Sequence, residues 1–155
     1  MKVFLVRHAR AGHRNEWEGD DHDRPLSRRG LEQSKRLIRQ LEGYKIDRVL
    51  SSPYLRCVQT VELLAGVRDL KVEESDDFAE GNGHKAIEVV RGLAEGSHNV
   101  VACSHGDVIP DVVDHLLRTD AINLPTVQGW AKGSTWVLTA HGGRFESALY
   151  LPPPE

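Results

Sequence analysis

The sequence KVFLVRH at residues 2–8 decides the fold together with NVVACSHG at residues 99–106. In each stretch, four consecutive apolar residues are followed at once by polar ones, a pattern typical of a strand that is buried on both faces. Strands of this kind belong to parallel sheets that are covered by helices on both sides. The two stretches therefore predict an α/β domain built around central parallel strands.

Helical patterns and short strands alternate through the rest of the sequence. Four helices are expected. The first runs from its N-cap Ser27 to about Glu42, and the second from Ser52-Pro53 to Gly66. The third spans about 84–95, and the fourth runs from its N-cap Asp107 to Leu117. Further strands are expected at 47–51, more weakly at 70–72, and at 134–140 and 144–151, which flank His141-Gly142-Gly143 as a hairpin. The predicted fold is a mostly parallel central sheet with helices on both faces and an antiparallel C-terminal hairpin.

Length and composition predict one soluble domain over residues 1–151, followed by a disordered tail at 152–155. The 155 residues are 39% hydrophobic and 28% charged, as in globular proteins. The net charge of −3 provides no basic field for nucleic acid or an anionic membrane, so neither is expected as a partner. Two cysteines, Cys57 and Cys103, do not make a disulfide framework, and a cytoplasmic location is expected.

Basic side chains follow three of the predicted strands. Arg7-His8 ends the first strand, Arg56 comes in the first turn of the helix after residues 47–51, and Ser104-His105-Gly106 precedes another helix. In an open α/β sheet, ligands bind outside the carboxyl ends of the strands. Each feature alone is common at surfaces or in structural roles, but their joint placement predicts two histidines and two arginines at one edge.

This combination of residues suits a dianionic phosphoryl group. Arginine provides forked, charged donors for phosphate oxygens, and helix N-termini add backbone N–H groups. A neutral imidazole can attack phosphorus, and neighbouring arginines disfavour its charged form. Arginine and helix charge then replace Mg²⁺, so no metal and no cofactor are expected.

Three motifs resemble those of the histidine phosphatase superfamily, the phosphoglycerate-mutase-like phosphatases. They are Leu5-Val6-Arg7-His8-Ala9, then 51–60 (SSPYLRCVQT), then Ser104-His105-Gly106, with 24–30 (RPLSRRG) similar to the segment before the first helix. The match spans nearly the whole chain and is most similar to the short SixA-type phosphohistidine phosphatases.

The resemblance implies a role for each matching residue. His8 would carry the phosphoryl group in a covalent intermediate, and Arg7, Arg56 and His105 would form the phosphate pocket with Gly106 beside them. Arg24 and Arg14 match positions that contact the anion in many members, although a polar residue, usually Asn, is commoner at the position of Arg14.

The proton donor is assigned from the segment Asp77-Phe78-Ala79-Glu80-Gly81, which resembles the acid-bearing segment of larger relatives. Glu80 is the candidate, and Glu73, Glu74, Asp76 and Asp77 are the alternatives in the same region. Ala9 stands where Gly is usual, and Arg10 stands where the mutases carry Glu. The second difference, with the short chain, argues against mutase activity.

Three functions stay open at this point. The first is a phosphatase for phosphomonoesters or for phosphohistidine on a protein. The second is a phosphatase for nucleotides or related small phosphorylated metabolites, because similar domains follow Nudix hydrolases in fused bacterial chains. The third is a regulatory module that binds phosphorylated partners without turnover.

Several other charged residues have more than one interpretation. The loop Asp20-Asp21-His22-Asp23 could hold a metal or be a solvated acidic loop. Arg28 and Arg29 lie at a helix N-terminus, where cations are disfavoured, so either a bound phosphate or simple surface exposure could account for them. Lys132 is a further candidate for shaping the site.

Overall fold

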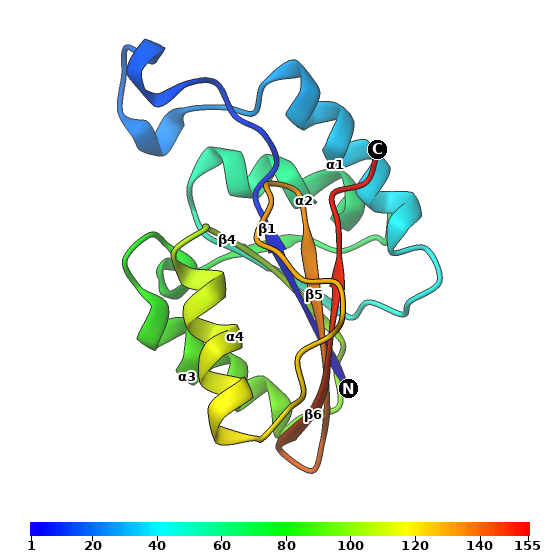
Figure 1. The fold of residues 1–155 in the computed structure, drawn as a ribbon. Coiled ribbons are helices and arrows are strands. Elements are labelled where there is room, and N and C mark those ends of the chain that lie inside the picture. Colours follow the sequence, from blue (N-terminus) through cyan, green and yellow to red (C-terminus); the bar gives the residue numbers. More distant parts are fainter.

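The computed structural model describes residues 1–155. A six-stranded sheet runs through its middle in the order β3-β2-β4-β1-β5-β6 (Figure 1). The strands are β1 Lys2–Arg7, β2 Arg48–Ser51, β3 Val72–Glu74, β4 Val100–Ser104, β5 Thr135–His141 and β6 Arg144–Leu151. β1, β4, β2 and β3 are parallel to one another, whereas β5 is antiparallel to both β1 and β6. The predicted, mostly parallel sheet with an antiparallel C-terminal pair is confirmed.

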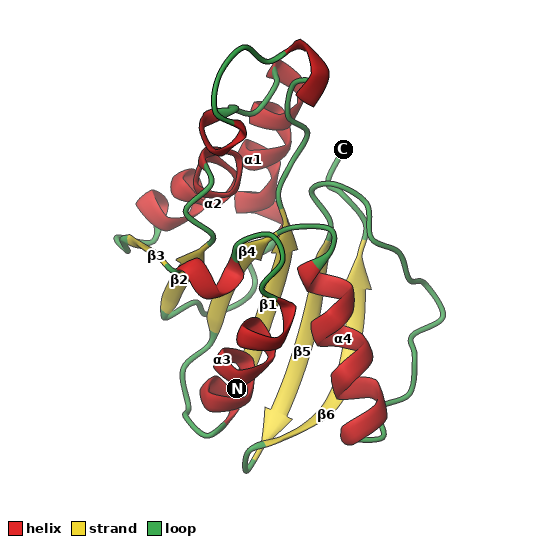
Figure 2. Cartoon of the chain, turned by 90° about the vertical axis from the view of Figure 1, so that its left-hand side faces the viewer, coloured by secondary structure: helices red, strands yellow, loops and turns green.

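Four helices cover the two faces of this sheet (Figure 2). α1 Arg28–Gln40 and α2 Leu55–Val67 pack on one face, and α3 Gly83–Ala94 and α4 Val108–Thr119 pack on the other. Three single turns of 3-10 helix, η1 Arg14–Glu16, η2 Asp21–Asp23 and η3 Asp76–Phe78, lie in the connections. None of the helices combines the length and apolar character that crossing a membrane requires.

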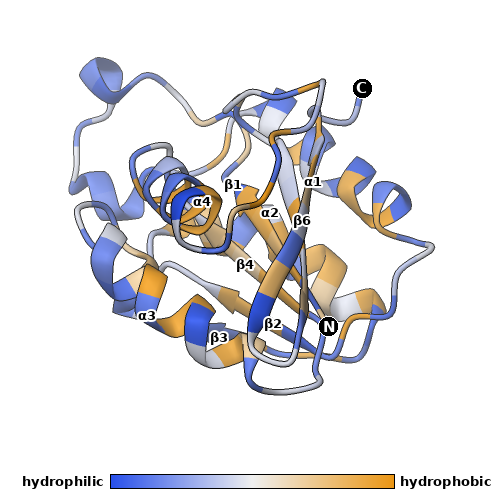
Figure 3. Cartoon of the chain, turned by 60° about the horizontal axis from the view of Figure 1, so that its bottom comes forward, coloured by the Kyte–Doolittle hydropathy of each residue, from blue (hydrophilic) through white to orange (hydrophobic).

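Successive side chains of the central strands point to opposite faces of the sheet, and this divides the hydrophobic core into two layers. In β1, Val3 and Leu5 pack with the α3–α4 layer, while Phe4 and Val6 pack with the α1–α2 layer. Successive strand residues point to opposite faces, so an uninterrupted apolar run is buried only when both faces are covered. Figure 3 shows this apolar character concentrated in the central strands.

The ends of the elements differ from the predictions where tertiary contacts decide them. Ser27 caps α1 as predicted and accepts from the Gly30 N–H at 3.2 Å, but α2 begins only at Leu55, after Pro53. Asp107 does not cap α4 with its side chain, because its Oδ2 accepts from the Gly81 N–H at 2.8 Å. The weak strand predicted at 70–72 lies at β3, two residues later.

Other details concern the packing of α1, the end of α2 and the last residues. Leu37 of α1 is buried, whereas Leu31 of the same helix is 40% exposed. α2 continues through Gly66 to Val67, and the chain reverses at Asp69, whose φ is 55°. Residues 152–155 have no secondary structure, and the Pro152 carbonyl accepts from the Gln40 side chain at 2.9 Å.

Candidate active site

The site lies at the carboxyl ends of three adjacent strands, β2, β4 and β1. His8 directly follows β1, and its N–H donates to the Ser104 carbonyl at the end of β4, at 3.0 Å. The Ser52 N–H after β2 donates to the Cys103 carbonyl at 2.9 Å. These backbone bonds extend the parallel ladder past the strands and hold the three loops together. The sequence correctly places the basic residues at one edge of the sheet.

His8 is held as a buried, neutral imidazole. Its side chain is almost enclosed, with the residue 6% exposed, and Nδ1 lies 2.8 Å from the Ala9 carbonyl. A carbonyl only accepts, so Nδ1 carries the ring proton and Nε2 keeps its lone pair. Burial lowers the pKa of His8 to about 3, with further lowering by His105, Arg56 and Arg7. Burial is the largest cause of this shift, and the two arginines act in the expected direction.

His105 faces His8, with 5.6 Å between the ring centroids. Its Nε2 lies 2.8 Å from the Ser52 hydroxyl. A hydroxyl that donates to Nε2 leaves the ring proton on Nδ1. That buried nitrogen has no hydrogen-bond partner and lies 3.5 Å from Glu80 Oε1.

Arg7 is positioned by a carbonyl and by a glycine. Its Nη1 donates to the Trp130 carbonyl at 2.7 Å, and its buried Nε has no partner. A Cβ on Gly106 would lie 2.7 Å from Arg7 Cζ, closer than such contacts allow. Glycine at 106 therefore leaves the space in which the guanidinium lies.

Arg56 is completely buried and is held by acidic partners on two sides. Its Nη1 donates to the Asp21 carbonyl at 2.9 Å, and its Nη2 contacts Asp21 Oδ2 at 3.1 Å and Glu80 Oε1 at 2.8 Å. Its Nε remains without a partner. Both carboxylates come from segments far from Arg56 in the sequence.

Three buried nitrogens around His8 are thus unsatisfied: Arg7 Nε, Arg56 Nε and His105 Nδ1. Buried polar groups almost always have hydrogen-bond partners, and an unpaired one costs about 1–3 kcal/mol. When all the unpaired groups at one site are donors, the missing partner is an acceptor. The arrangement is therefore suited to binding an anion beside His8.

The remaining predicted residues also gather here. Glu80 Oε1 accepts from Arg14 Nη2 at 3.1 Å as well as from Arg56. Arg24 is buried, donates to Asp21 at 2.9 Å through Nε and also donates to the Gly12 carbonyl. Arg14 and Arg24 are therefore brought to the site through their acidic partners.

Asp21 is the residue of the site that the sequence did not indicate. It contacts Arg24, Arg56 and Arg14, the last at 3.4 Å. Burial alone would raise the pKa of its carboxyl, but the Arg24 hydrogen bond and the three arginine charges lower it. No three His, Cys, Asp or Glu side chains gather as potential metal ligands, in the 20–23 loop or elsewhere. The sequence offered one signal for Asp21: two arginines predicted for the site, Arg24 and Arg56, need an acidic partner, and Asp21 lies three residues before Arg24.

A strongly basic cavity of about 850 Å³ opens above these groups. It is lined by Arg7, His8, Arg10, Ala11, Gly12, His13, Arg14, Arg24, Ser27, Arg29, Glu80, His105, Gly106, Asp107 and Lys132. Six of these residues are Arg or Lys, against two carboxylates. Arg56 is completely buried and does not line this cavity, but it is paired with Glu80, which does.

Residues 3–86 match the model of the histidine phosphatase superfamily, branch 1. The 8-oxo-(d)GTP phosphatase of Mycolicibacterium smegmatis is 34% identical over 157 residues, which cover 99% of this chain and 48% of that protein. The phosphohistidine phosphatase SixA of Escherichia coli is 41% identical over 64 residues, covering 40% of this chain and 38% of that protein. The chain spans about half the length of the M. smegmatis relative.

Solved structures agree on the fold. The protein histidine phosphatase SixA, complexed with tungstate, superposes with a TM-score of 0.80 at 24% identity and covers 99% of this chain and 97% of its own. A mycobacterial glucosyl-3-phosphoglycerate phosphatase gives 0.73 at 16% identity, with 99% of both chains covered. The chain belongs to the histidine phosphatase superfamily, branch 1, and its fold is that of the SixA-type members.

Proposed function

We propose that this chain is a metal-independent phosphatase that forms a covalent phosphohistidine at His8. The carrying observation is the set of three unpartnered buried donors, Arg7 Nε, Arg56 Nε and His105 Nδ1, around an imidazole whose Nε2 is free to attack. Fixed donors that match a transferring phosphoryl group stabilise its charge without reorganisation. Phosphoryl transfer needs little else from the protein.

The reaction takes two balanced steps. In the first, His8 Nε2 forms a bond to phosphorus while the bond to the leaving oxygen or nitrogen breaks, and the leaving atom takes a proton. In the second, a water molecule loses a proton and attacks phospho-His8, which releases inorganic phosphate and restores the neutral ring. Because the pKa of His8 is about 3, the attacking form is present throughout the physiological pH range.

Glu80 is the proposed group that gives and then takes the proton. Its Oε1 lies at the cavity wall, 2.8 Å from Arg56 Nη2 and 3.5 Å from His105 Nδ1. Among the alternatives, Glu73 pairs with Arg48 at 2.8 Å, and neither it nor Glu74, Asp76 or Asp77 lines the cavity. One carboxyl in this position can serve both steps.

The first substrate class that we propose is a phosphomonoester or a phosphohistidine on a protein, with the SixA similarity in support. A nucleotide or related metabolite is the second, because similarity to the 8-oxo-(d)GTP phosphatase extends over 99% of this chain. A binding module without turnover is disfavoured by the free Nε2 of His8, which mere phosphate binding does not need.

The first test is hydrolysis of p-nitrophenyl phosphate in excess EDTA. Wild type should be active and inhibited by orthovanadate, whereas His8→Ala should lose at least about 10³-fold in kcat with an unchanged far-UV spectrum, because the nucleophile is gone. His84→Ala is the matched control, since His84 is an exposed histidine that does not line the cavity.

An alkaline quench followed by mass spectrometry should locate the phosphoryl group on His8. A His8→Ala protein that keeps a tenth of the wild-type rate, or activity that EDTA removes, would contradict the mechanism.

A further inference from the structure

Three cations of the cavity take no part in the chemistry described above and form no ion pair. They are Arg10, Arg29 and Lys132, here called the outer wall, and all three line the same cavity as His8. They come from three segments: the loop after β1, the first turn of α1 and the segment before β5.

Backbone contacts cross-brace the outer wall. The Arg10 carbonyl accepts from the Ser27 N–H at 2.9 Å and from the Ser27 hydroxyl at 3.1 Å. Gln33 of α1 links the segments that carry Arg10 and Lys132. Its side chain accepts from the Arg10 N–H at 2.9 Å and donates to the Lys132 carbonyl at 3.3 Å. Any Cβ at position 30 would lie 1.9 Å from the Arg10 carbonyl oxygen, so Gly30 permits this close approach. The three cations are thus carried on a fixed frame.

The outer wall has no acidic partner. Arg10, Arg29 and Lys132 form no ion pair, whereas Arg14, Arg24 and Arg56 are all paired with Asp21 or Glu80. Glu32, on the same helix as Arg29, is paired with Lys35 at 3.3 Å. Glu155 lies in an adjoining hollow beside Arg10 and Arg29 but pairs with neither.

The cations also act on one another. Burial lowers the pKa of Lys132, and the charges of Arg7, Arg10, Arg24 and Arg56 lower it further. Like charges held together in a cavity repel, and a bound anion relieves that repulsion. The proposed function assigns the donors beside His8 to one phosphoryl group, and the outer wall stays available for another anion.

We propose that the outer wall binds a second phosphate group of the same substrate molecule, so that the substrate is a small compound with two phosphate groups. This rests on the proposed function, which places the first phosphate at His8. Guanidinium and ammonium groups on a fixed frame are the side chains that recognise phosphate. Their position inside the cavity favours a small molecule over an acidic protein surface.

The test is calorimetric binding of inorganic phosphate and inorganic pyrophosphate to the His8→Ala protein in EDTA. Pyrophosphate should bind at least about 30-fold more tightly, since each charge-assisted hydrogen bond contributes about tenfold or more. In the same background, Arg29→Gln with Lys132→Gln should reduce this preference to below about threefold.

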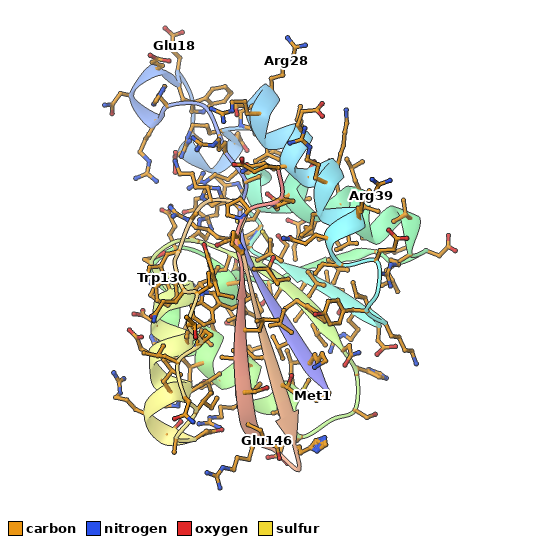
Figure 4. The ribbon with its side chains drawn as sticks, turned by 45° about the vertical axis from the view of Figure 1, so that its right-hand side comes forward. Met1, Glu18, Arg28, Arg39, Trp130 and Glu146 are labelled. Carbon is orange, nitrogen blue, oxygen red and sulfur yellow. The ribbon has the colours of Figure 1, made fainter.

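Arg28→Gln with Arg39→Gln is the matched control. It removes the same charge from α1 residues that do not line the cavity and that point away from the body of the molecule (Figure 4). The control should keep the preference for pyrophosphate. Equal binding of the two anions, or a preference that survives Arg29→Gln with Lys132→Gln, would overturn the subsite.

Turnover distinguishes this proposal from the proposed function. If the wild-type enzyme hydrolyses p-nitrophenyl phosphate but the His8→Ala protein shows no preference for pyrophosphate, the second phosphate site is contradicted and the proposed mechanism is not. If the His8→Ala protein prefers pyrophosphate but the wild-type enzyme hydrolyses no p-nitrophenyl phosphate, the proposed mechanism is contradicted and the second phosphate site is not. Binding of ADP is then compared with that of AMP, and binding of glucose 1,6-bisphosphate with that of glucose 6-phosphate, to tell whether the two phosphates must be directly linked or may be farther apart. Equal binding within both pairs would also overturn the subsite.

Discussion

The inner and outer cations of the cavity carry the same charge but are stabilised in different ways. The inner group is Arg14, Arg24 and Arg56, which share Asp21 and Glu80 as partners; Arg24 and Arg56 are buried, whereas the Arg14 side chain is 61% exposed. The outer wall is exposed and unpaired. A buried charge needs a partner because the interior cannot solvate it, whereas an exposed charge is stabilised by water. We therefore expect Arg24 and Arg56, the buried members of the inner group, to support stability, Arg56 to support catalysis as well, and the outer wall to affect binding alone.

The largest effect should come from Arg56→Ala, which breaks the inner group. We expect kcat for p-nitrophenyl phosphate to fall about 10³-fold, since a phosphate donor is lost. The free energy of unfolding should fall by about 2–3 kcal/mol, because Asp21 and Glu80 lose their buried partner. Urea denaturation measures the second quantity. Arg29→Ala is the comparison from the outer wall and should change stability by less than about 0.5 kcal/mol; an equal loss in the two variants would remove the distinction.

A smaller and more selective effect is expected for Glu80→Gln, which keeps the shape of the inner group but removes its carboxylate. Hydrolysis of an alkyl phosphate should slow about 10²-fold, because its leaving oxygen needs a proton. Hydrolysis of p-nitrophenyl phosphate, which has a good leaving group, should slow less than about fivefold. Asp77→Asn, a neighbouring carboxylate outside the cavity, is the control. Equal slowing of the two substrates would make Glu80 a partner of Arg56 and not a proton donor.

The last effect concerns stability alone and should appear in its pH dependence. The pKa of His8 is about 3 in the folded protein, against 6.5 for a histidine freely exposed to water. Between these values the unfolded chain binds more protons, so stability rises with pH, by up to about 1.4 kcal/mol per unit from this residue. Urea denaturation from pH 4.5 to 7.5 should show a steeper rise for wild type than for His8→Gln. Parallel curves would mean that the ring is not held in its neutral form.

Much of the fold follows from local sequence patterns. The apolar runs in β1 and β4 identify central strands, because only a strand covered on both faces needs four apolar residues in succession. Helix periodicity and Ser27 locate α1, and Arg7, His8, Arg56 and His105 follow strand ends in the sequence. All four therefore fall at the same edge of the sheet.

The parts that could not be predicted depend on contacts between distant segments. Asp21 and Glu80 are 35 and 24 residues from Arg56, and no periodicity links them. Asp107 resembles a helix cap in sequence, yet its carboxylate holds the Gly81 N–H and thereby the loop that carries Glu80. The bridge from Gln33 to the segment of Lys132 spans 99 residues. Such pairings are set by the packing of loops over a completed sheet.

The bond between His8 Nδ1 and the Ala9 carbonyl has a consequence for sequence variation. The acceptor that selects the tautomer of the ring belongs to the main chain, so no side-chain substitution can delete it. Position 9 is limited by space, because Ala9 is completely buried, and not by any chemical group. The tautomer of the ring is thus set by the backbone path after β1, and it does not depend on which side chains the surrounding loops carry.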